Sequence, residues 1–523
     1  MTTPPPRRRR WLRRLLWAGL VLAALLVADW LAACWLLWGG YERLVGALRE
    51  PVKALGSGQT CIQVHELDLM SSKERLIGGV EVLAYGDGFT VFLEREAITF
   101  RLERGSRTTF SSSKCRTGFE AERCDFGEAR RAMTELADNL PRPGLFTRAV
   151  LSLVVRPLIT GVWRADPLFH WRIWLPGGSA VVASDGWLRE ASSSLRWGKR
   201  RWRLALRRRP SEIEFIGPSG RAVKQVDIAA TELDRGLAAA IRVLALRLQP
   251  VRKEPDRITR EGRGWLEVKD GRRVLHLKGT PYEIGYQHGK LLAPNIKRMA
   301  ERLVYGVGLL YSLEKGEWFV REAEKLVERQ RPHIPPEYFE EMKGLAEGAG
   351  VPLALIQAAN IFPEFFHCSG VALFGKATKG GTLLHARVLD YMTEVGLQDE
   401  AVLMAVEREG ARRCVNVSYA GFIGSVTGMN EKQVAIGEMG GRGEGQWDGT
   451  PMSFLVRGAL ENCDTLEQAL DYMRSRKRTC EYYYVISDGK SKSARGVAAT
   501  SGQFEVIAPG QHHPRLPDPV GDA

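Results

Sequence analysis

Cys368 is the residue whose type and setting most directly suggest covalent chemistry. It lies in Phe366–Phe374, an apolar run that predicts a β-strand, and a second such run, Gly380–Tyr391, follows a short turn. The two runs predict a hairpin that pairs the strand of Cys368 with that of Arg387. A thiolate is a strong nucleophile, so Cys368 is a candidate catalytic residue. The residues alone leave a plainer alternative open, in which Cys368 is a small apolar core residue and Asp390 caps a strand end.

Three further segments accompany this hairpin in the chain: Gly279–Gly289, Pro336–Gly350 and Tyr419–Ile436. The first predicts a helix that starts at the Thr280-Pro281 turn, with two glycines four residues apart that leave one face bare for close packing. The second predicts a helix with one apolar face, ended by its glycine-rich last residues. The third predicts another hairpin, with its turn at residues 430–432.

In this order, the four segments resemble the acyl-coenzyme A:6-aminopenicillanic-acid acyltransferase family, over about residues 270 to 510. That family belongs to the self-cleaving N-terminal-nucleophile hydrolases and is related to the choloylglycine and penicillin V amide hydrolases. The resemblance implies that the precursor cuts itself between His367 and Cys368. The freed Cys368 would be the nucleophile, and its own α-amine the general base. A free α-amine has a pKa of about 7.7–8, close to working pH.

The same resemblance implies roles for two other residues of the hairpin. Asp390 matches the acid that orients the new ammonium group, and Arg387 matches an arginine that lines the nucleophile in the choloylglycine branch. His288 is interpreted as a structural residue of the segment that precedes the cut, with a role as a base left open as the alternative. The family supplies an oxyanion-binding Asn from a Thr-Asn-His-like segment after the Asp488-Gly489 turn, and this sequence shows no such segment. Asn430 is a poor substitute.

Three functions remain open at this stage. The first is an autoproteolytically activated cysteine amidohydrolase or acyltransferase that acts on a linear amide or an acyl thioester. The second is a membrane-tethered, phospholipase-like hydrolase of acyl esters. The third is a catalytically dead, tethered binding or scaffold protein, which the missing Asn favours and the Cys368–Asp390 pair disfavours.

The composition excludes several other classes. The chain has 523 residues, of which 44% are hydrophobic, and a net charge of +14 from 75 Lys+Arg against 61 Asp+Glu. Much of the excess lies in the first 14 residues, so the charge gives little reason to expect nucleic-acid binding. No zinc-type cysteine spacing, phosphate loop or dinucleotide fingerprint is present, and we expect neither a metal nor a cofactor. Cys115 and Cys124 could form a disulfide in an oxidising compartment or remain two thiols.

The N-terminal region predicts a membrane segment. Leu15–Trp38 is nearly all apolar and long enough to cross about 30 Å of hydrocarbon as a helix. The arginine cluster before it predicts a cytoplasmic N-terminus, so the main body of a single-pass, bacterial-type protein would be extracytoplasmic. A twin-arginine export signal, or a lipoprotein cleavage site at Cys34, are the alternatives to an uncleaved anchor.

A region without readable chemistry separates this anchor from the C-terminal half. Val80–Leu102 and His170–Leu206 predict strands, and Asp234–Leu248 predicts a helix. Arg201–Arg209 predicts a strand with one basic face, which is either a solvated face or a surface for anionic lipid. We expect three parts: an Arg-rich stub and membrane anchor at 1–40, an α+β region at 41–250, and a nucleophile domain at 258–523. In the last, 258–367 would be the pro-segment and 368–523 the part that bears the nucleophile, which is either complete or truncated at its C-terminus.

The predicted fold class is therefore α+β. It combines a C-terminal αββα sandwich of the N-terminal-nucleophile type with a preceding α+β region and an N-terminal transmembrane helix. The expected partners are a small-molecule amide or acyl substrate and the membrane, the latter through the N-terminal helix.

Overall fold

The protein is described by a computed structural model. The structure describes residues 254–511 except 362–366, 391–394 and 442–444, and before them residues 39 and 42 and the elements between Gly58 and Leu246. The predicted membrane segment, Leu15–Trp38, lies outside the described residues, as does Cys115. Among the described helices, none is both long and apolar enough to cross a membrane. The chain divides near Arg242 into two compact units, with a short segment, Leu313–Gly316, grouped with the first.

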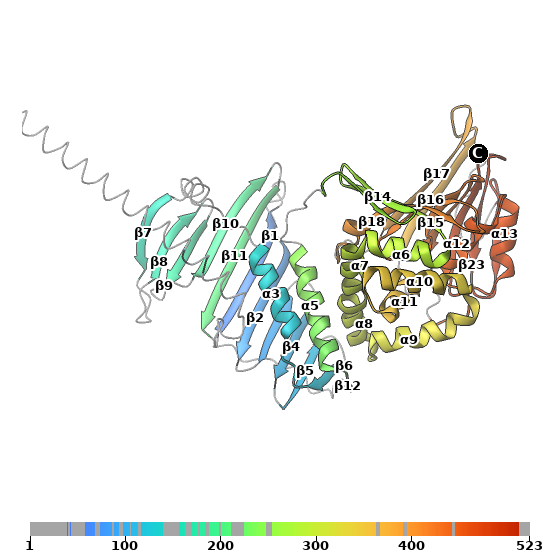
Figure 1. The fold of residues 1–523 in the computed structure, drawn as a ribbon. Helices are drawn as coiled ribbons and strands as arrows, with labels where there is room; N and C mark the ends of the chain where they lie inside the picture. Colours follow the sequence, from blue (N-terminus) through green and yellow to red (C-terminus); the bar gives the residue numbers. More distant parts are fainter. Residues whose placement is uncertain are drawn as a thin grey trace, which may run out of the picture. The chain divides into compact units, whose positions relative to one another are not determined.

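The first unit contains a large, mainly antiparallel sheet (Figure 1). Its strands, in sheet order, are β12 (Lys224–Asp227), β6 (Thr117–Glu122), β5 (Arg107–Ser112), β4 (Ile98–Arg104), β3 (Gly88–Leu93), β2 (Glu74–Tyr85), β1 (Gly58–Leu67), β11 (Arg200–Pro210), β10 (Leu188–Trp197), β9 (Gly178–Ala183), β8 (His170–Leu175) and β7 (Arg156–Val162). The strands predicted within 80–102 and 170–206 are confirmed. The side chains of the basic strand β11 lie outside the described residues.

Among the described residues, two helices accompany this sheet, α3 (Gly127–Asn139) and α5 (Ala230–Leu246). The second confirms the helix predicted from Asp234 onward. The Asp234 carboxylate accepts hydrogen bonds from the backbone N–H groups of Glu128 and Ala129, at 2.8 and 2.9 Å. These N–H groups lie in the first turn of α3, where a helix has no internal acceptors for them. A side chain of α5 thus caps α3.

The second unit is built on a ten-stranded sheet among its described residues. The strands, in sheet order, are β13 (Arg257–Glu261), β14 (Gly264–Lys269), β15 (Arg272–Gly279), β18 (Ala401–Arg408), β19 (Cys414–Tyr419), β20 (Thr427–Asn430), β21 (Val434–Gly440), β22 (Tyr482–Asp488), β23 (Ser493–Ala499) and β24 (Phe504–Ile507). Neighbouring strands are antiparallel except β15 and β18, which pair in parallel. The β20–β21 pairing confirms the predicted second hairpin.

Helices cover one face of this sheet, and a single apolar core cluster lies between the two layers (Figure 1). The helical segments are α6 (Pro281–Leu291), α7 (Ala293–Ala300), the π-helix η1 (Glu301–Val307), α8 (Gly308–Lys315), α9 (Phe319–Gln330), η2 (Arg331–His333), α10 (Pro336–Ala349), α11 (Leu353–Ile361), η4 (Leu397–Glu400), α12 (Met452–Asn462) and α13 (Leu466–Ser475). The side chains of Val402, Met404 and Val406 alternate along β18 into this core. Every second residue of a strand faces one side, so the other face of the sheet is free for a second layer.

The start of α6 and the end of α10 form as predicted. Thr280 accepts a hydrogen bond from the N–H of Glu283, whose carboxylate accepts one from the N–H of Thr280, and Pro281 occupies the first helical position. This reciprocal arrangement is a capping box. Gly350 ends α10 with φ 64°, a left-handed conformation that glycine adopts without steric cost.

Close packing of α6 against α10 depends on four glycines. A Cβ built on Gly285 would lie 2.0 Å from the Glu341 carbonyl oxygen, and one on Gly344 would lie 2.2 Å from the Tyr282 carbonyl oxygen. Gly289 and Gly348 make the same kind of approach. The bare helix face predicted from the glycine spacing is confirmed, and any side chain there would push the backbones apart.

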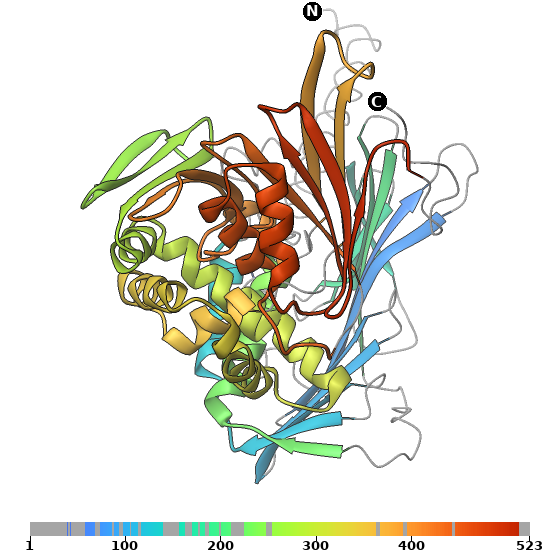
Figure 2. The same cartoon turned by 90° about the vertical axis from the view of Figure 1, so that its right-hand side faces the viewer.

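The second layer of strands is the hairpin of β16 (His367–Gly375) and β17 (Gly381–Asp390) (Figure 2). It lies on the face of the ten-stranded sheet opposite the helices, over β21 and β22. Gly370 permits this approach, because a Cβ there would lie 2.7 Å from Met439 Sδ. The described residues thus form helix, sheet and hairpin layers, three of the four layers of the predicted αββα sandwich. The outer face of the hairpin is exposed among these residues.

Replacing Gly344 with Ala should destabilise the second unit. The new methyl group would overlap a backbone carbonyl that cannot rotate away, and overpacking of this kind costs about 1–3 kcal/mol. We expect a lower midpoint of denaturant unfolding, measured by circular dichroism. Gly502→Ala is the matched control, because no atom lies within 4 Å of a Cβ at that position. Equal midpoints for the two variants would contradict the packing argument.

Candidate active site

The hairpin brings two of the predicted site residues into contact. Gly370 pairs with Arg387, so Cys368, two residues earlier on β16, faces the same side of the hairpin as Arg387. Arg387 Nη2 donates a hydrogen bond to Cys368 Sγ at 2.7 Å. The third predicted residue, Asp390, ends β17, and its backbone pairs with that of His367. The side chains of Asp390 and His367 lie outside the described residues.

Glu438 of β21 holds the Arg387 side chain in place through two hydrogen bonds. The guanidinium donates from Nε to the Glu438 carbonyl oxygen at 2.9 Å and from Nη2 to Glu438 Oε2 at 3.0 Å. Both side chains are almost fully buried, at 2% and 3% exposure. A buried cation requires a partner, because its transfer out of water is costly. Nη2 therefore links the thiol of Cys368 to the carboxylate of Glu438.

Glu438 has an unusual protonation equilibrium for a carboxyl group. Burial raises its pKa to about 7, although the neighbouring Arg387 charge acts in the opposite direction. Its charge therefore changes near neutral pH, and with it the charge that Arg387 faces. The sequence analysis missed Glu438, because 51 residues separate it from Arg387 and nothing in the hairpin pattern points to it.

Two more polar groups lie on the inner face of the hairpin or close to it. His385 Nδ1 is 2.8 Å from Ser487 Oγ of β22, and burial lowers the His385 pKa, which favours the neutral ring. Burial raises the pKa of Tyr419 to about 12, and the charges of Arg387 and Cys368 act on it with opposite signs. Tyr419 is thus electrostatically coupled to both members of the contact pair. Neither residue was predicted as part of the site.

Gly437 makes room for the inner face of the hairpin. A Cβ on Gly437 would lie 3.1 Å from both Arg387 Cγ and His385 Nε2. Such contacts are tighter than normal van der Waals separation, so a side chain there would displace the two hairpin residues. The glycine thereby allows Arg387 to reach the carbonyl oxygen of the next residue, Glu438.

The loop from Tyr419 to Ser425 is fixed by residues distant in sequence. His288 Nε2 accepts a hydrogen bond from the Gly421 N–H at 2.9 Å, and Asn360 bonds both the Gly421 carbonyl oxygen and the Ile423 N–H. Burial lowers the His288 pKa to about 3, so its ring is neutral, and its Nδ1 has no hydrogen-bond partner among the described residues. His288 therefore positions the loop, in line with its predicted structural role.

A buried charge network secures the same loop from the helix side. Arg457 of α12 donates two hydrogen bonds to the Glu341 carboxylate, one to Glu461 and one to the Ile423 carbonyl oxygen. All three side chains are at most 2% exposed. Breaking a fully buried pair leaves an uncompensated charge, so this network strongly constrains where Ile423 lies.

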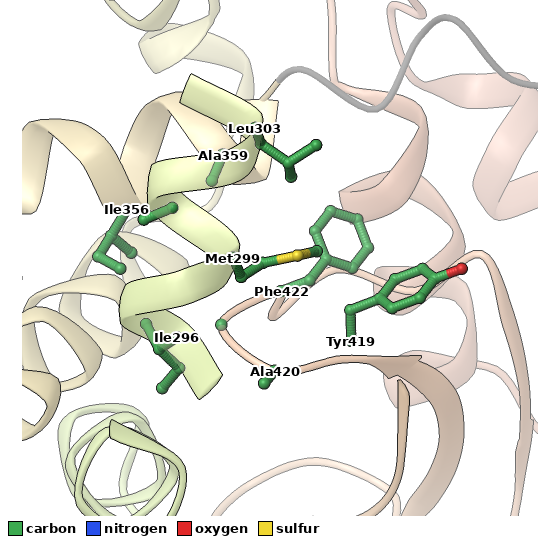
Figure 3. Close-up of a pocket in the computed structure, with 10 residues that line it drawn as sticks. Ile296, Met299, Leu303, Ile356, Ala359, Tyr419, Ala420 and Phe422 are labelled. Atoms are coloured by element: carbon green, nitrogen blue, oxygen red, sulfur yellow. The ribbon is translucent and has the colours of Figure 1, made fainter. Parts of the chain in front are cut away.

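A narrow apolar pocket lies beside Tyr419 (Figure 3). It is lined by side chains from α7, η1, α11 and the loop, including Met299, Leu303, Ile356 and Phe422. The hydroxyl of Tyr419 points away from Met299 (Figure 3). The free volume is about 20 Å³, enough for a water molecule and too small for an acyl chain. The π-helical geometry of η1, a form often found at functional sites, occurs in one wall of this pocket.

Asn430 has a structural role. Its Nδ2 donates to the carbonyl oxygens of Leu460 and Cys463, both at 2.8 Å, and its Oδ1 accepts from the N–H groups of Lys432 and Val434. Every hydrogen-bonding position of this amide is occupied by backbone. It ties the β20–β21 turn to α12 and has no capacity left for an oxyanion. Among the described residues, no cluster of His, Cys, Asp or Glu could hold a metal ion.

Replacing Arg387 with Met should slow the alkylation of Cys368. A guanidinium in contact with sulfur favours the thiolate, which is the reactive form, so we expect the rate with iodoacetamide at pH 7 to fall by roughly tenfold. The rate is read from mass spectra of the peptide that contains Cys368. Arg387→Lys is the matched variant: it keeps the charge but cannot bond Cys368 and Glu438 in the same way, and its rate should be intermediate. An unchanged rate for the Met variant would show that the contact does not activate the thiol.

Glu438→Gln should remove a specific pH dependence of stability. The folded pKa of Glu438, about 7, lies above its ordinary value of 4.5. A raised carboxyl pKa contributes stability that is fully present below pH 4.5 and is lost as the pH rises through about 7. The free energy of unfolding of the parent chain, relative to that of E438Q, should therefore decline across this window and then level off.

The measurement is denaturant unfolding at a series of pH values. Glu431→Gln serves as the control, because a hydrogen bond from Arg413 lowers the pKa of this exposed carboxyl. Its contribution is lost as the pH falls, the opposite direction. A difference between the parent chain and E438Q that stays constant from pH 4.5 to 7 would contradict the assignment.

Comparison with known proteins shows which proteins this chain is similar to. The chain is 26% identical over 245 residues to the protein dcd1B of Dictyostelium discoideum. The aligned region covers 42% of this chain and 49% of dcd1B. It is 28% identical over 217 residues to the acid ceramidase of Mus musculus. The aligned region covers 35% of this chain and 53% of the ceramidase. The chain thus spans about half the length of the curated relatives it matches.

A solved structure with a local likeness is the Caenorhabditis elegans ortholog of N-acylethanolamine-hydrolyzing acid amidase. It shares 21% identity, covers 27% of this chain and 64% of that one, and has a TM-score of 0.23. Residues 377–512 match the family model of the acyl-coenzyme A:6-aminopenicillanic acid acyl-transferases, a range that includes Arg387 and Glu438. The resemblance predicted from the sequence is confirmed by this match of residues 377–512 to the family model.

Proposed function

We propose that the protein is a self-activating cysteine amidohydrolase or acyltransferase that acts on a linear amide or an acyl thioester. The observation that carries the proposal is the contact between Cys368 Sγ and the buried guanidinium of Arg387. A core cysteine with no chemical role would not require a cation buried beside it. The family match and the amidohydrolase relatives support an enzyme of this kind.

In the proposed maturation, Cys368 Sγ attacks the carbonyl carbon of His367. The peptide bond breaks as the thioester forms, and the α-amine of Cys368 is released. Water then hydrolyses the thioester, which leaves a carboxylate on His367 and restores the thiol. Each step conserves atoms and needs no cofactor.

In the proposed catalytic cycle, the α-amine of Cys368 accepts the thiol proton, and the thiolate attacks the substrate carbonyl. The leaving amine departs with a proton, and the acyl group stays on sulfur. Water or a second amine then releases the acyl group, which distinguishes hydrolysis from transfer. Arg387 favours the thiolate, Glu438 positions Arg387, and Asp390 is proposed to orient the new ammonium group.

The apolar pocket beside Tyr419 is, as it stands, too small to hold the acyl group of the proposed substrate. Its lining is almost entirely aliphatic and aromatic, which suits a hydrocarbon chain. Since its free volume is about 20 Å³, the wall formed by α7 and η1 would have to move outward to admit one. An acyl ester is the second candidate substrate class, and the same thiolate could attack it.

Replacing Cys368 with Ala should abolish both maturation and turnover. The purified full chain, denatured and analysed by intact mass, should give two fragments of which the second begins at Cys368. The C368A chain should give one uncut species and no amide hydrolysis. Cys414→Ala is the matched control, because Cys414 is buried in β19 and burial raises its pKa to about 12.

The C414A chain should be cut like the parent. If the parent chain is itself uncut but hydrolyses amides, self-cleavage is wrong while the nucleophile assignment survives. If C368A still turns over substrate, the nucleophile assignment is wrong. A parent chain that is uncut and inactive would instead support the scaffold alternative.

A further inference from the structure

Two polar side chains of β17, those of His385 and Arg387, lie on the inner face of the hairpin. They are two residues apart, so they point to the same side of the strand. Each is bonded to a different strand of the sheet that the hairpin covers. Arg387 Nη2 donates to Glu438 of β21, and His385 Nδ1 shares a hydrogen bond of 2.8 Å with Ser487 Oγ of β22. The hairpin is therefore attached to the sheet at two points, on adjacent strands.

The attachment on β22 involves a buried hydroxyl group. Ser487 is 1% exposed. Its partners across the sheet are Ala435 of β21 and Ala494 of β23, neither of which has a polar side chain. A buried hydroxyl that lacks a hydrogen-bond partner is costly. The bond to His385 therefore favours the native position of β17 over β22.

Gly437 of β21 brings the two attachment points together. A Cβ built on Gly437 would lie 3.1 Å from His385 Nε2 and 3.1 Å from Arg387 Cγ. The imidazole ring and the aliphatic stem of Arg387 thus lie side by side across one glycine. With Nδ1 bonded to Ser487 and Nε2 against Gly437, the ring is fixed at both ends. It thereby limits the space in which the Arg387 stem can lie.

The charge state of His385 suits this place. Burial lowers the pKa of His385, which favours the neutral ring. The titratable groups bonded together in this layer are Arg387 of the same strand, Cys368 of β16 and Glu438 of β21. Ser487 carries no charge. A neutral ring therefore occupies the space beside Arg387 without adding a second cation that would compete for Glu438.

We propose that His385 is a positioning residue that acts on Cys368 through Arg387. Its bond to Ser487 holds the ring in place, and the ring fixes the course of the Arg387 stem. The guanidinium then meets Cys368 Sγ at 2.7 Å. A guanidinium that is displaced from this position makes a weaker hydrogen bond and favours the thiolate less. The inference rests on the proposed function, in which the Cys368 thiolate is the nucleophile.

The test is the rate at which iodoacetamide alkylates Cys368 in the full chain, measured across pH by mass spectrometry. His385→Phe keeps a planar ring and removes the bond to Ser487. We expect its rate at pH 7 to fall by roughly threefold, with a rise of about half a unit in the apparent pKa of the thiol. Ser487→Ala removes the same bond from the other side and should act similarly. Ser491→Ala is the matched control, because this exposed serine after β22 bonds Ser493, and its rate should equal that of the parent.

Two further variants separate positioning from a merely structural role. In an Arg387→Met background, His385→Phe should cause no further fall in rate, because its effect passes through the guanidinium. His385→Asn places an amide close to the position of Nδ1, so it can still bond Ser487 and should recover most of the parent rate. Circular dichroism establishes that each variant is folded. Rates are compared between samples in the same state of cleavage, as determined by intact mass.

An equal fall for His385→Phe with and without Arg387 would overturn the proposal, because His385 would then act on the hairpin as a whole. A rate for His385→Phe that matches the parent rate would overturn it as well. Alkylation requires neither self-cleavage nor turnover, so this inference and the proposed function fail separately. A chain that hydrolyses no amide but shows the Arg387-dependent effect contradicts the proposed function alone. An active chain whose alkylation rate is insensitive to His385 contradicts this inference alone.

Discussion

The buried charge of Arg387 is the constraint around which this site is organised. A guanidinium that is 2% exposed has lost most of its hydration, and it donates hydrogen bonds to one sulfur, one carbonyl oxygen and one carboxylate. Those partners lie on two different sheets. If the hairpin moved relative to β21, the guanidinium would become exposed or would stay buried without its hydrogen-bond partners. A single side chain thereby fixes the distance between the layer that carries Cys368 and the layer that carries Glu438.

The helices contribute to this site from a distance. Four glycines bring α6 and α10 into backbone contact, and this contact places His288 where it can accept the Gly421 N–H. Arg457, paired with Glu341 of α10, reaches the same loop from α12. The loop in turn begins at Tyr419, which lines the apolar pocket (Figure 3) and interacts electrostatically with Arg387 and Cys368. Helix packing thus fixes the backbone of the loop that begins at Tyr419.

The parts of the structure that could be predicted were those encoded by short-range patterns. Pairing of the Cys368 and Arg387 strands followed from two apolar runs and a turn, and the ends of α6 and α10 followed from Thr280 and Gly350. Glu438, Ser487 and the Glu341–Arg457 pair were missed, because their partners lie 51 to 116 residues away. No local periodicity marks a polar residue whose partner is brought to it only by the sheet order. Asp390 and the cut at His367 remain predictions.

The parallel pairing of β15 with β18 joins segments on either side of the proposed cut. In an uncut chain this pairing is intramolecular, and the connecting backbone keeps the two strands at high effective concentration. After a cut before Cys368, the same strands would belong to separate polypeptides, and their reunion from the unfolded state would become a concentration-dependent encounter. After such a cut, an enzyme that had unfolded would refold only by an encounter between its two fragments.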